Sequence, residues 1–341
     1  MQAEAVSAEK GIVLDALTGQ TLWERRADER SLIASTTKIL TALVVCRTCN
    51  VLEQVKIPKE AVGIEGSSLY LREGEILTVQ ELLYGLMLRS GNDAAAALAI
   101  HCGGSIEQFA RMMNAEAQRL GLRGSHFVNP HGLDGPDHYS TARDLAVLTA
   151  EAMNNPVFAR TVCTKSVKLG DRVLTNHNKL LWRLPGAEGV KTGYTRAAGR
   201  LLVSSCQRRG RRLICVSVNA PDDWNDHVFL LERAFARYRM TEIVPQGQCL
   251  GRLAVVGGEA PEVRLLAGKA VSFPLAEGEK VRILLPRREF CCAPVEKAAD
   301  AGMAAVVLGE QEIARIPLEF GEQINVQKEE RKPLWRRIFG G

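Results

Sequence analysis

The chain has 341 residues, of which 46% are hydrophobic and 24% are charged; these values exclude disordered and fibrous classes and suit a large folded domain with a smaller one. The net charge is only +5, the basic residues are scattered, and no basic motif interleaved with aromatic residues is present, so nucleic acid is not an expected partner.

The first five residues are polar and lack the basic start and apolar stretch of an export signal. No apolar run reaches the roughly 18 residues that a membrane-spanning helix needs. Two interpretations remain open from this pattern: a cytosolic protein, or an exported protein whose signal peptide is absent from this chain.

Two strand-like runs near the N-terminus, Gly11–Asp15 and Thr21–Glu24, flank a glycine-containing turn and predict a β-hairpin. Apolar residues between 39 and 44 then recur at helical spacing, which predicts a central, buried helix from about Ser35. In such a helix Ser35 and Lys38 share one face, because they are three residues apart.

A serine beside a lysine at the start of a buried helix can form an activated nucleophile. A serine hydroxyl attacks poorly alone, and a lysine in an apolar setting can lose its proton and act as the base. Taken alone, however, Ser35-x-x-Lys38 fits a capping serine and an exposed lysine better, so the hypothesis depends on partners elsewhere in the chain.

The sequence from about residue 30 to 155 predicts mostly helices, and two polar motifs lie between them. Thr78-x-x-Glu81 has the pattern of a capping box that opens a helix. Ser90-Gly91-Asn92 interrupts two apolar helices and forces a turn deep in the structure, where its polar side chains need hydrogen-bond partners or a ligand. The remaining pattern predicts a loop with a short strand over 63–71 and helices over 94–101, 105–120 and 141–153.

After about residue 176 the pattern becomes strand-like. Runs over 189–195, 200–205 and 213–218 predict an antiparallel meander, and a helix follows over 226–239. Because strands at both ends enclose a helical insert, we expect an α+β domain in which the N-terminal hairpin joins the meander in one sheet.

Five short strand-like segments beyond about residue 244 predict a small all-β domain. The expected domains are therefore 1–243, 244–325 and a basic amphipathic tail over 326–341. In the tail, Trp335, Ile338 and Phe339 share a face beside basic residues, so it is either a short membrane-surface contact or a frayed end.

Nine cysteines are many for an exported protein. Cys46-x-x-Cys49 resembles a redox pair but lacks thioredoxin-like surroundings, so we interpret both as buried small hydrophobes. The adjacent Cys291 and Cys292 are not expected to bond to each other.

Three motifs stand in order along the chain: Ser35-x-x-Lys38, Ser90-Gly91-Asn92 and Lys191-Thr192-Gly193. Each is weak alone, but together they form the motif set of class A β-lactamases and penicillin-binding proteins. Across nearly its whole length the sequence resembles the penicillin-binding D-alanyl-D-alanine carboxypeptidases of bacteria, a family of serine SxxK peptidases. Further family-like stretches are Gly66-Ser67-Ser68, 129–133, Asn176-x-Asn178-x-Leu180 and the small β domain.

The resemblance implies a β-lactamase/transpeptidase-like domain, an antiparallel sheet with a helical subdomain, followed by the small β domain. It implies an exported, cell-wall-associated hydrolase that removes the terminal D-alanine of peptidoglycan stem peptides through a serine acyl-enzyme, without a metal or cofactor. β-Lactam antibiotics would acylate the same serine.

The motif residues then receive roles. Ser35 would be the nucleophile and Lys38 its base. Lys191 would help to keep Lys38 neutral by like-charge repulsion. Ser90 would bridge the two lysines and pass the proton to the leaving amine, and Asn92 would hold the substrate amide.

The strand that carries Lys191-Thr192-Gly193 would bind the substrate. Backbone N–H groups of Ser35 and Tyr194 would form the oxyanion hole. Gly193 would leave room for the peptide to lie along the strand. Thr192 would bind the terminal carboxylate.

One departure concerns that carboxylate. Many relatives carry an arginine shortly before the last helix of the domain, whereas residues 219–227 of this chain contain none. Arg196 or Arg200, near the Lys-Thr-Gly strand, would have to replace it, and the sequence does not choose between them.

Several alternatives remain. A β-lactamase needs a second base, but Glu151 lacks the expected context, and we interpret it as solvated. The motifs exclude neither transpeptidase nor endopeptidase activity, and a non-catalytic wall-binding relative would share them. The six histidines show no ligand spacing or triad pattern, so we expect structural roles for them.

Overall fold

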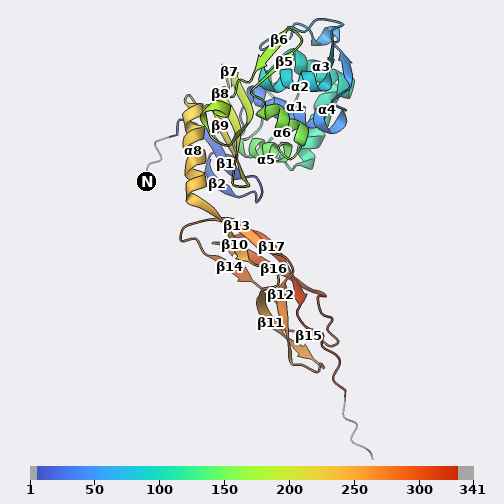
Figure 1. The fold of residues 1–341 in the computed structure, drawn as a ribbon, viewed down its shortest axis with the longest axis vertical. Coiled ribbons are helices and arrows are strands. Elements are labelled where there is room, and N and C mark those ends of the chain that lie inside the picture. Colours follow the sequence, from blue (N-terminus) through green and yellow to red (C-terminus); the bar gives the residue numbers. More distant parts are fainter. Residues whose placement is uncertain (1–5, 329–341) are drawn as a thin grey trace, which may run out of the picture. The chain divides into compact units, whose positions relative to one another are not determined.

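A computed structural model describes residues 6–328, and the chain divides into two compact units, Met1–Ala236 and Arg237–Gly341 (Figure 1). The first unit contains both helices and strands, and the part of the second unit from Tyr238 to residue 328 is built from strands. This is the predicted α+β organisation with a small all-β part.

The first unit is built on a five-stranded antiparallel sheet with the order β2-β1-β9-β8-β7. The N-terminal hairpin joins the meander as predicted, because β1 pairs with β9 along its whole length. The strands are β1 (Lys10–Asp15), β2 (Thr21–Arg25), β7 (Ala187–Thr195), β8 (Gly199–Arg208) and β9 (Arg211–Val218).

Helices cover both sides of this sheet, with α8 (Asp223–Arg237) along one side and the helical insert on the other (Figure 1). At the centre of the insert lies α1, in which residues 38–45 are all buried, as the apolar spacing predicts. The other helices are α2 (Val79–Leu88), α3 (Asn92–Gly103), α4 (Ile106–Arg119), α5 (Ala142–Ala152), α6 (Pro156–Cys163) and α7 (Leu180–Arg183).

Local sequence explains where several helices begin. Thr78 and Glu81 form the predicted capping box at the start of α2. The helix predicted from Ser35 starts differently: Ala34–Thr37 is a 3-10 turn, and α1 begins at Lys38 (Lys38–Thr48). The short strand predicted over 63–71 is wrong, because this segment is a loop whose backbone bonds to the side chain of Asp93 instead of to a strand.

Two small two-stranded antiparallel sheets complete the first unit. One pairs β3 (Gln54–Lys56) with β4 (Ile76–Thr78), and the other pairs β5 (Ser166–Leu169) with β6 (Arg172–Thr175). The sequence pattern does not indicate these sheets, because each strand has only three or four residues.

The helix predicted over 226–239 ends early, at Arg237. The next residues form β10 (Tyr238–Val244), which pairs with β13 (Val271–Ala276) and belongs to the second unit. Its main sheet has the order β14-β16-β17-β12-β11-β15. These strands are β11 (Cys249–Val256), β12 (Glu262–Ala267), β14 (Val281–Leu284), β15 (Phe290–Cys292), β16 (Asp300–Leu308) and β17 (Gln311–Phe320).

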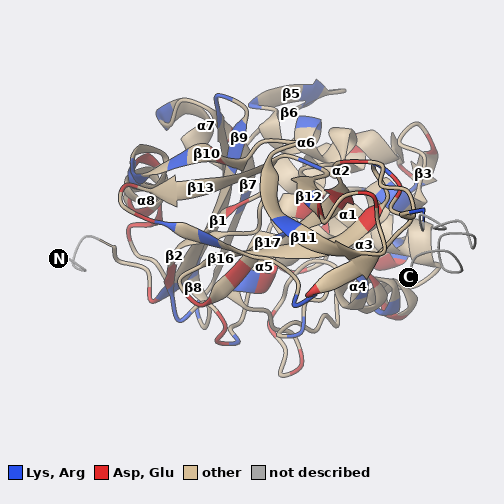
Figure 2. Cartoon of the chain, turned by 90° about the horizontal axis from the view of Figure 1, so that it is seen from below, with Lys and Arg blue, Asp and Glu red and all other residues tan. Residues whose placement is uncertain are grey.

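Figure 2 shows that acidic and basic residues are interspersed along the ribbon. Many of them form ion pairs, for example Arg212 with Glu188. Among residues 6–328, no helix combines the length and the apolar character needed to cross a membrane. The amphipathic tail motif around Trp335 lies outside the described residues.

A disulfide joins Cys49, at the end of α1, to Cys102, in the last turn of α3. Our interpretation of Cys49 as a buried small hydrophobe is therefore wrong, whereas Cys46 is a half-buried free thiol. Cys291 and Cys292 are both free, as predicted.

Candidate active site

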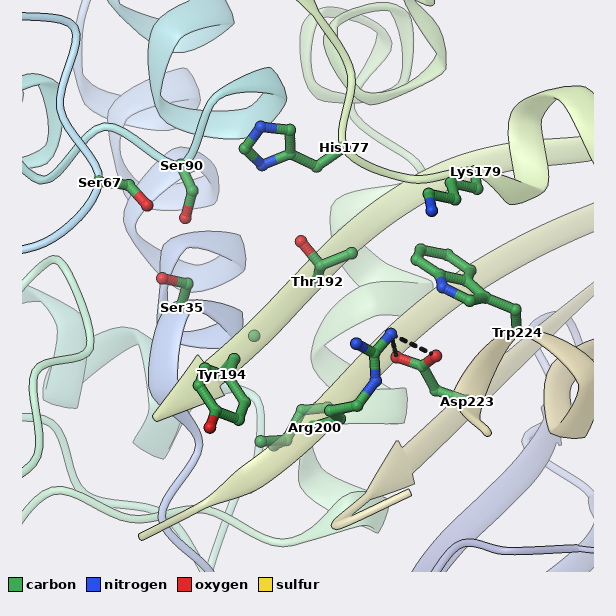
Figure 3. Close-up of a pocket in the computed structure, with 12 residues that line it drawn as sticks. Ser35, Ser67, Ser90, His177, Lys179, Thr192, Tyr194, Arg200, Asp223 and Trp224 are labelled. Atoms are coloured by element: carbon green, nitrogen blue, oxygen red, sulfur yellow. Dashed lines mark hydrogen bonds and ion pairs between the residues drawn. The ribbon is translucent and has the colours of Figure 1, made fainter. Parts of the chain in front are cut away.

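One pocket of the first unit collects residues from all three motifs (Figure 3). The hydroxyl groups of Ser35, Ser67 and Ser90 gather at one end, and Arg200 and Trp224 lie at the other. The lining residues are Ser35, Ser67, Ser90, His177, Lys179, Thr192, Gly193, Tyr194, Arg200, Leu201, Asp223 and Trp224.

Ser35 and Lys38 meet as the sequence predicts, although Ser35 lies in the 3-10 turn. Lys38 Nζ is 3.0 Å from Ser35 Oγ. The turn packs against β7, where a Cβ added to Gly193 would lie 3.3 Å from the carbonyl oxygen of Ile33. Gly193 therefore allows β7 to approach the turn closely. The sequence alone suggests a different reason for this glycine, namely room for the substrate peptide.

The amine of Lys38 is fully buried and has two further partners, both carbonyl oxygens. It donates to Asn92 Oδ1 (2.7 Å) and to the backbone oxygen of His131 (2.5 Å). A neutral amine has two N–H groups and one lone pair, and carbonyl oxygens can only accept. When both N–H groups bind these acceptors, the lone pair faces Ser35 Oγ.

Burial lowers the pKa of Lys38 well below its usual value, and the positive charge of Lys191 lowers it further. The carboxylate of Asp93 acts in the opposite direction. Burial alone lowers the pKa of Lys191 to about 7. The predicted like-charge effect of Lys191 is therefore present, but desolvation is the larger cause.

Asn92 begins α3 and is held from two sides. Its Oδ1 accepts from Lys38, and its Nδ2 donates to the backbone oxygen of Glu65. The second N–H of this amide has no hydrogen-bond partner among residues 6–328.

Ser90 lines the pocket in a left-handed conformation with φ of 64°. Its hydroxyl makes no hydrogen bond to Lys38 or Lys191 within the described part of the chain. Lys191 Nζ instead donates to the backbone oxygen of Thr192 (2.9 Å). The predicted bridge between the two lysines is absent from this arrangement, and the Ser90 hydroxyl faces the pocket.

The far end of the pocket distinguishes the two arginine candidates. Arg200, on β8, lines the pocket, and its Nη2 binds both carboxylate oxygens of Asp223 at 2.7 and 3.0 Å (Figure 3). Arg196 is exposed and is not among the lining residues. The two positive charges of Arg200 and Lys179 exceed the one negative charge of Asp223, so this end of the pocket is cationic.

Sequence reasoning assigned no catalytic or binding role to six lining residues, one of which is the apolar Leu201. Ser67 lies in a stretch noted only as family-like, and His177 and Lys179 flank Asn178 in another. Asp223 and Trp224 lie in the segment that departs from the family pattern. This departure is the feature of the sequence that could have indicated their place in the pocket.

The alternative catalytic residues have structural partners. Glu151 forms ion pairs with Arg47 and Arg119 and does not line the pocket. His227 is buried between the hydroxyls of Ser204 and Ser217, which is a structural role. His177 differs from the expectation because it lines the pocket.

Comparisons with known proteins find a matching family model and several similar proteins. A model of the family Peptidase_S11, described as D-alanyl-D-alanine carboxypeptidase, matches residues 1–222. The D-alanyl-D-alanine carboxypeptidase DacF of Bacillus subtilis is 30% identical over 94% of this chain and 86% of its own.

Two solved structures are also similar. Penicillin binding protein 5 from Haemophilus influenzae has a TM-score of 0.81 and 28% identity, covering 95% of this chain and 99% of its own. A mutant of the Streptomyces K15 DD-transpeptidase has a TM-score of 0.65 and 34% identity, covering 68% of this chain and 98% of its own.

Proposed function

The chain belongs to the Peptidase_S11 family of D-alanyl-D-alanine carboxypeptidases, and we propose that it removes the terminal D-alanine of peptidoglycan stem peptides through an acyl-enzyme on Ser35. The observation that carries the proposal is the contact between Ser35 Oγ and the buried amine of Lys38, whose other partners are acceptors.

In the first step Lys38 takes the proton of Ser35, and Oγ attacks the carbonyl carbon of the penultimate D-alanine. The bond to the terminal D-alanine amine then breaks. The proton passes from Lys38 to this leaving amine. We assign its relay to the hydroxyl of Ser90, which lines the pocket and must come within hydrogen-bond distance of Lys38 when the substrate binds. Water finally hydrolyses the ester and restores Ser35.

Fixed groups stabilise the charge that develops on the attacked carbonyl oxygen. We assign the oxyanion hole to the backbone N–H groups of Ser35 and Tyr194, worth about 3 kcal/mol per donor in comparable acyl transfer. The free N–H of Asn92 would bind a substrate amide oxygen. The positive charge of Lys191 lowers the pKa of Lys38 further, although burial is the larger cause.

We assign the terminal carboxylate to Thr192 and Arg200. Asp223 orients Arg200 through one terminal nitrogen and leaves its other N–H groups for the ligand. Arg200 then replaces the arginine that residues 219–227 lack.

Arg200→Ala is expected to lower kcat/KM for a peptide ending in D-Ala-D-Ala by about 10- to 100-fold, the usual value of a charged hydrogen bond to a carboxylate. Steady-state D-alanine release measures this effect. Arg196→Ala is the matched control, because it removes a nearby exposed arginine, and equal losses in both variants would contradict the assignment.

The pH dependence follows from the lowered pKa of Lys38. Only the neutral amine can act as the base, so the acylation rate should rise with pH until Lys38 is deprotonated. Lys191→Met removes the repelling charge, raises the pKa of Lys38 and should move this rise to higher pH. An unchanged or opposite shift in stopped-flow acylation rates would refute the like-charge effect.

The same site explains why β-lactams should form long-lived adducts. A β-lactamase needs a base for rapid hydrolysis of the acyl group, and Glu151 is engaged by two arginines outside the pocket. We therefore favour a penicillin-inhibited carboxypeptidase over a β-lactamase.

We further propose that the protein acts outside the cytoplasm on the cell wall, where its substrate lies. The tail around Trp335 would add a peripheral membrane contact through its apolar face and basic residues.

Product analysis tests the reaction. A pentapeptide ending in D-Ala-D-Ala is incubated with the protein, with and without an acceptor amine. Released D-alanine without a cross-linked product identifies a carboxypeptidase. A cross-linked product identifies transpeptidation, the activity named for the similar Streptomyces K15 protein. Release of neither product would support a non-catalytic wall-binding protein.

A further inference from the structure

The carbonyl group of His131 that binds Lys38 belongs to a closed loop, residues 126–139. Backbone hydrogen bonds between His126 and Tyr139 close its two ends. Inside it, Asn129 Oδ1 accepts from the backbone N–H groups of His131 and Gly132, and Asn129 Nδ2 donates to the backbone oxygen of Leu133 (2.9 Å). The loop therefore has a fixed internal shape.

This loop lies directly on the start of α1. Thr41 Oγ1 donates to the backbone oxygen of Pro130 (2.7 Å), and Lys38 Nζ donates to that of His131. Gly132 has φ of 88°, and a Cβ added there would lie 1.9 Å from the backbone oxygen of Ala34. The loop and the 3-10 turn therefore touch backbone to backbone.

His138 ties the other side of the loop to the same turn. The side chain is 1% exposed and accepts a hydrogen bond at Nδ1 from the backbone N–H of Val128 (3.1 Å). Because Nδ1 is an acceptor, the ring hydrogen of a neutral histidine is on Nε2. Nε2 therefore donates to Thr37 Oγ1 (2.7 Å), a fully buried hydroxyl directly before Lys38.

We propose that His138 is a positioning residue for the reaction, because it holds residues 126–139 on the catalytic turn so that the carbonyl of His131 directs the lone pair of Lys38 toward Ser35. The inference rests on the proposed role of Lys38 as the base. Without the second carbonyl acceptor, a neutral amine can rotate and point its lone pair away from Ser35.

The consequence for pH dependence has a definite sign. The charged or titratable groups around Lys38 are Lys191 from β7, Asp93 from α3, and His131 and His138 from the loop. Burial lowers the pKa of both histidines to about 4, so neither carries charge near neutral pH. A carbonyl acceptor favours the charged amine, so losing the His131 contact lowers the pKa of Lys38 further.

His138→Ala should therefore have two effects on acylation by a fluorescent penicillin. The plateau rate should fall by about 10- to 100-fold, because the reacting groups are misaligned. The rise of the rate with pH should also move to lower pH. His138→Gln can keep the hydrogen bond to Thr37 and should restore most of the rate and the original pH profile.

Two further variants separate positioning from stability. Thr37→Val removes the same hydrogen bond with little change of volume, and it should reproduce the pH shift even if His138→Ala fails to fold. His227→Ala removes a comparably buried histidine whose ring bonds to Ser204 and Ser217 and not to the catalytic turn, so it should lower Tm without moving the pH profile.

Folded Thr37→Val and His138→Ala proteins with the wild-type pH profile would overturn the inference, as would an equal shift in His227→Ala. Failure of the proposed function would look different. In that case the wild type would form no adduct, or Ser35→Ala would still form one.

Discussion

Replacing Ser35 by alanine is expected to lower D-alanine release from a D-Ala-D-Ala peptide by at least about 10⁴-fold, because it removes the proposed nucleophile. Among the residues that line the pocket, only Ser35 has its hydroxyl beside a buried amine, at 3.0 Å from Lys38 Nζ. Substrate binding should change little, because Oγ contributes to bond formation and not to recognition. D-Alanine release under substrate saturation measures the loss.

Ser166→Ala is the matched control for this variant. Ser166 is exposed on β5 and lies outside the pocket lining, so the same chemical change there should leave the rate unaltered. Substantial D-alanine release by Ser35→Ala would mean that another group is the nucleophile.

Replacing Lys38 by methionine is expected to lower the acylation rate by about 10²- to 10⁴-fold, the usual contribution of a positioned general base. Methionine keeps the length and apolar stem of the side chain in a fully buried position but has no lone pair of comparable basicity. Stopped-flow acylation by a fluorescent penicillin measures the loss. The residual rate should also lose the pH dependence that belongs to Lys38.

Lys38→Arg sharpens this test, because arginine keeps the charge and cannot give up its proton at ordinary pH. If positive charge near Ser35 were sufficient, the arginine variant would remain active. Near-wild-type acylation by either variant would show that Lys38 is not the base.

The central pairing was predictable because it is local. Ser35 and Lys38 share a face in a 3-10 turn as in an α-helix, so the error in the expected helix start did not affect it. The five-stranded sheet was predictable because its buried strands have the alternating or continuous apolar runs that are typical of β-strands. β10 was missed because most of its residues are exposed and its sequence lacks that pattern.

Other features of the site depend on contacts across the fold. Arg196 and Arg200 are close in sequence, and only the register of β7 against β8 places Arg200 in the pocket. The acceptor from His131 is a backbone group, which leaves no signature in residue types. The Cys49–Cys102 bond joins two helix ends that the sequence alone does not bring together.

The hydrogen-bond partners of Lys38 determine where the lone pair of its neutral amine points. Two carbonyl oxygens accept hydrogen bonds from the amine of Lys38, and burial together with the charge of Lys191 lowers its pKa. In the neutral form of the amine, the lone pair then faces Ser35. The hydrogen bond from His138 to Thr37 and the contact of Gly132 with Ala34 hold the loop over 126–139 against the 3-10 turn that carries Ser35.

Peptide mapping after treatment with benzylpenicillin tests the central claim most directly. The protein is acylated, digested and analysed by mass spectrometry, in parallel with Ser35→Ala. The account predicts one penicilloyl group on the wild-type peptide that contains Ser35 and no adduct on the variant. An adduct on a different residue, or an unmodified wild-type protein, would contradict it.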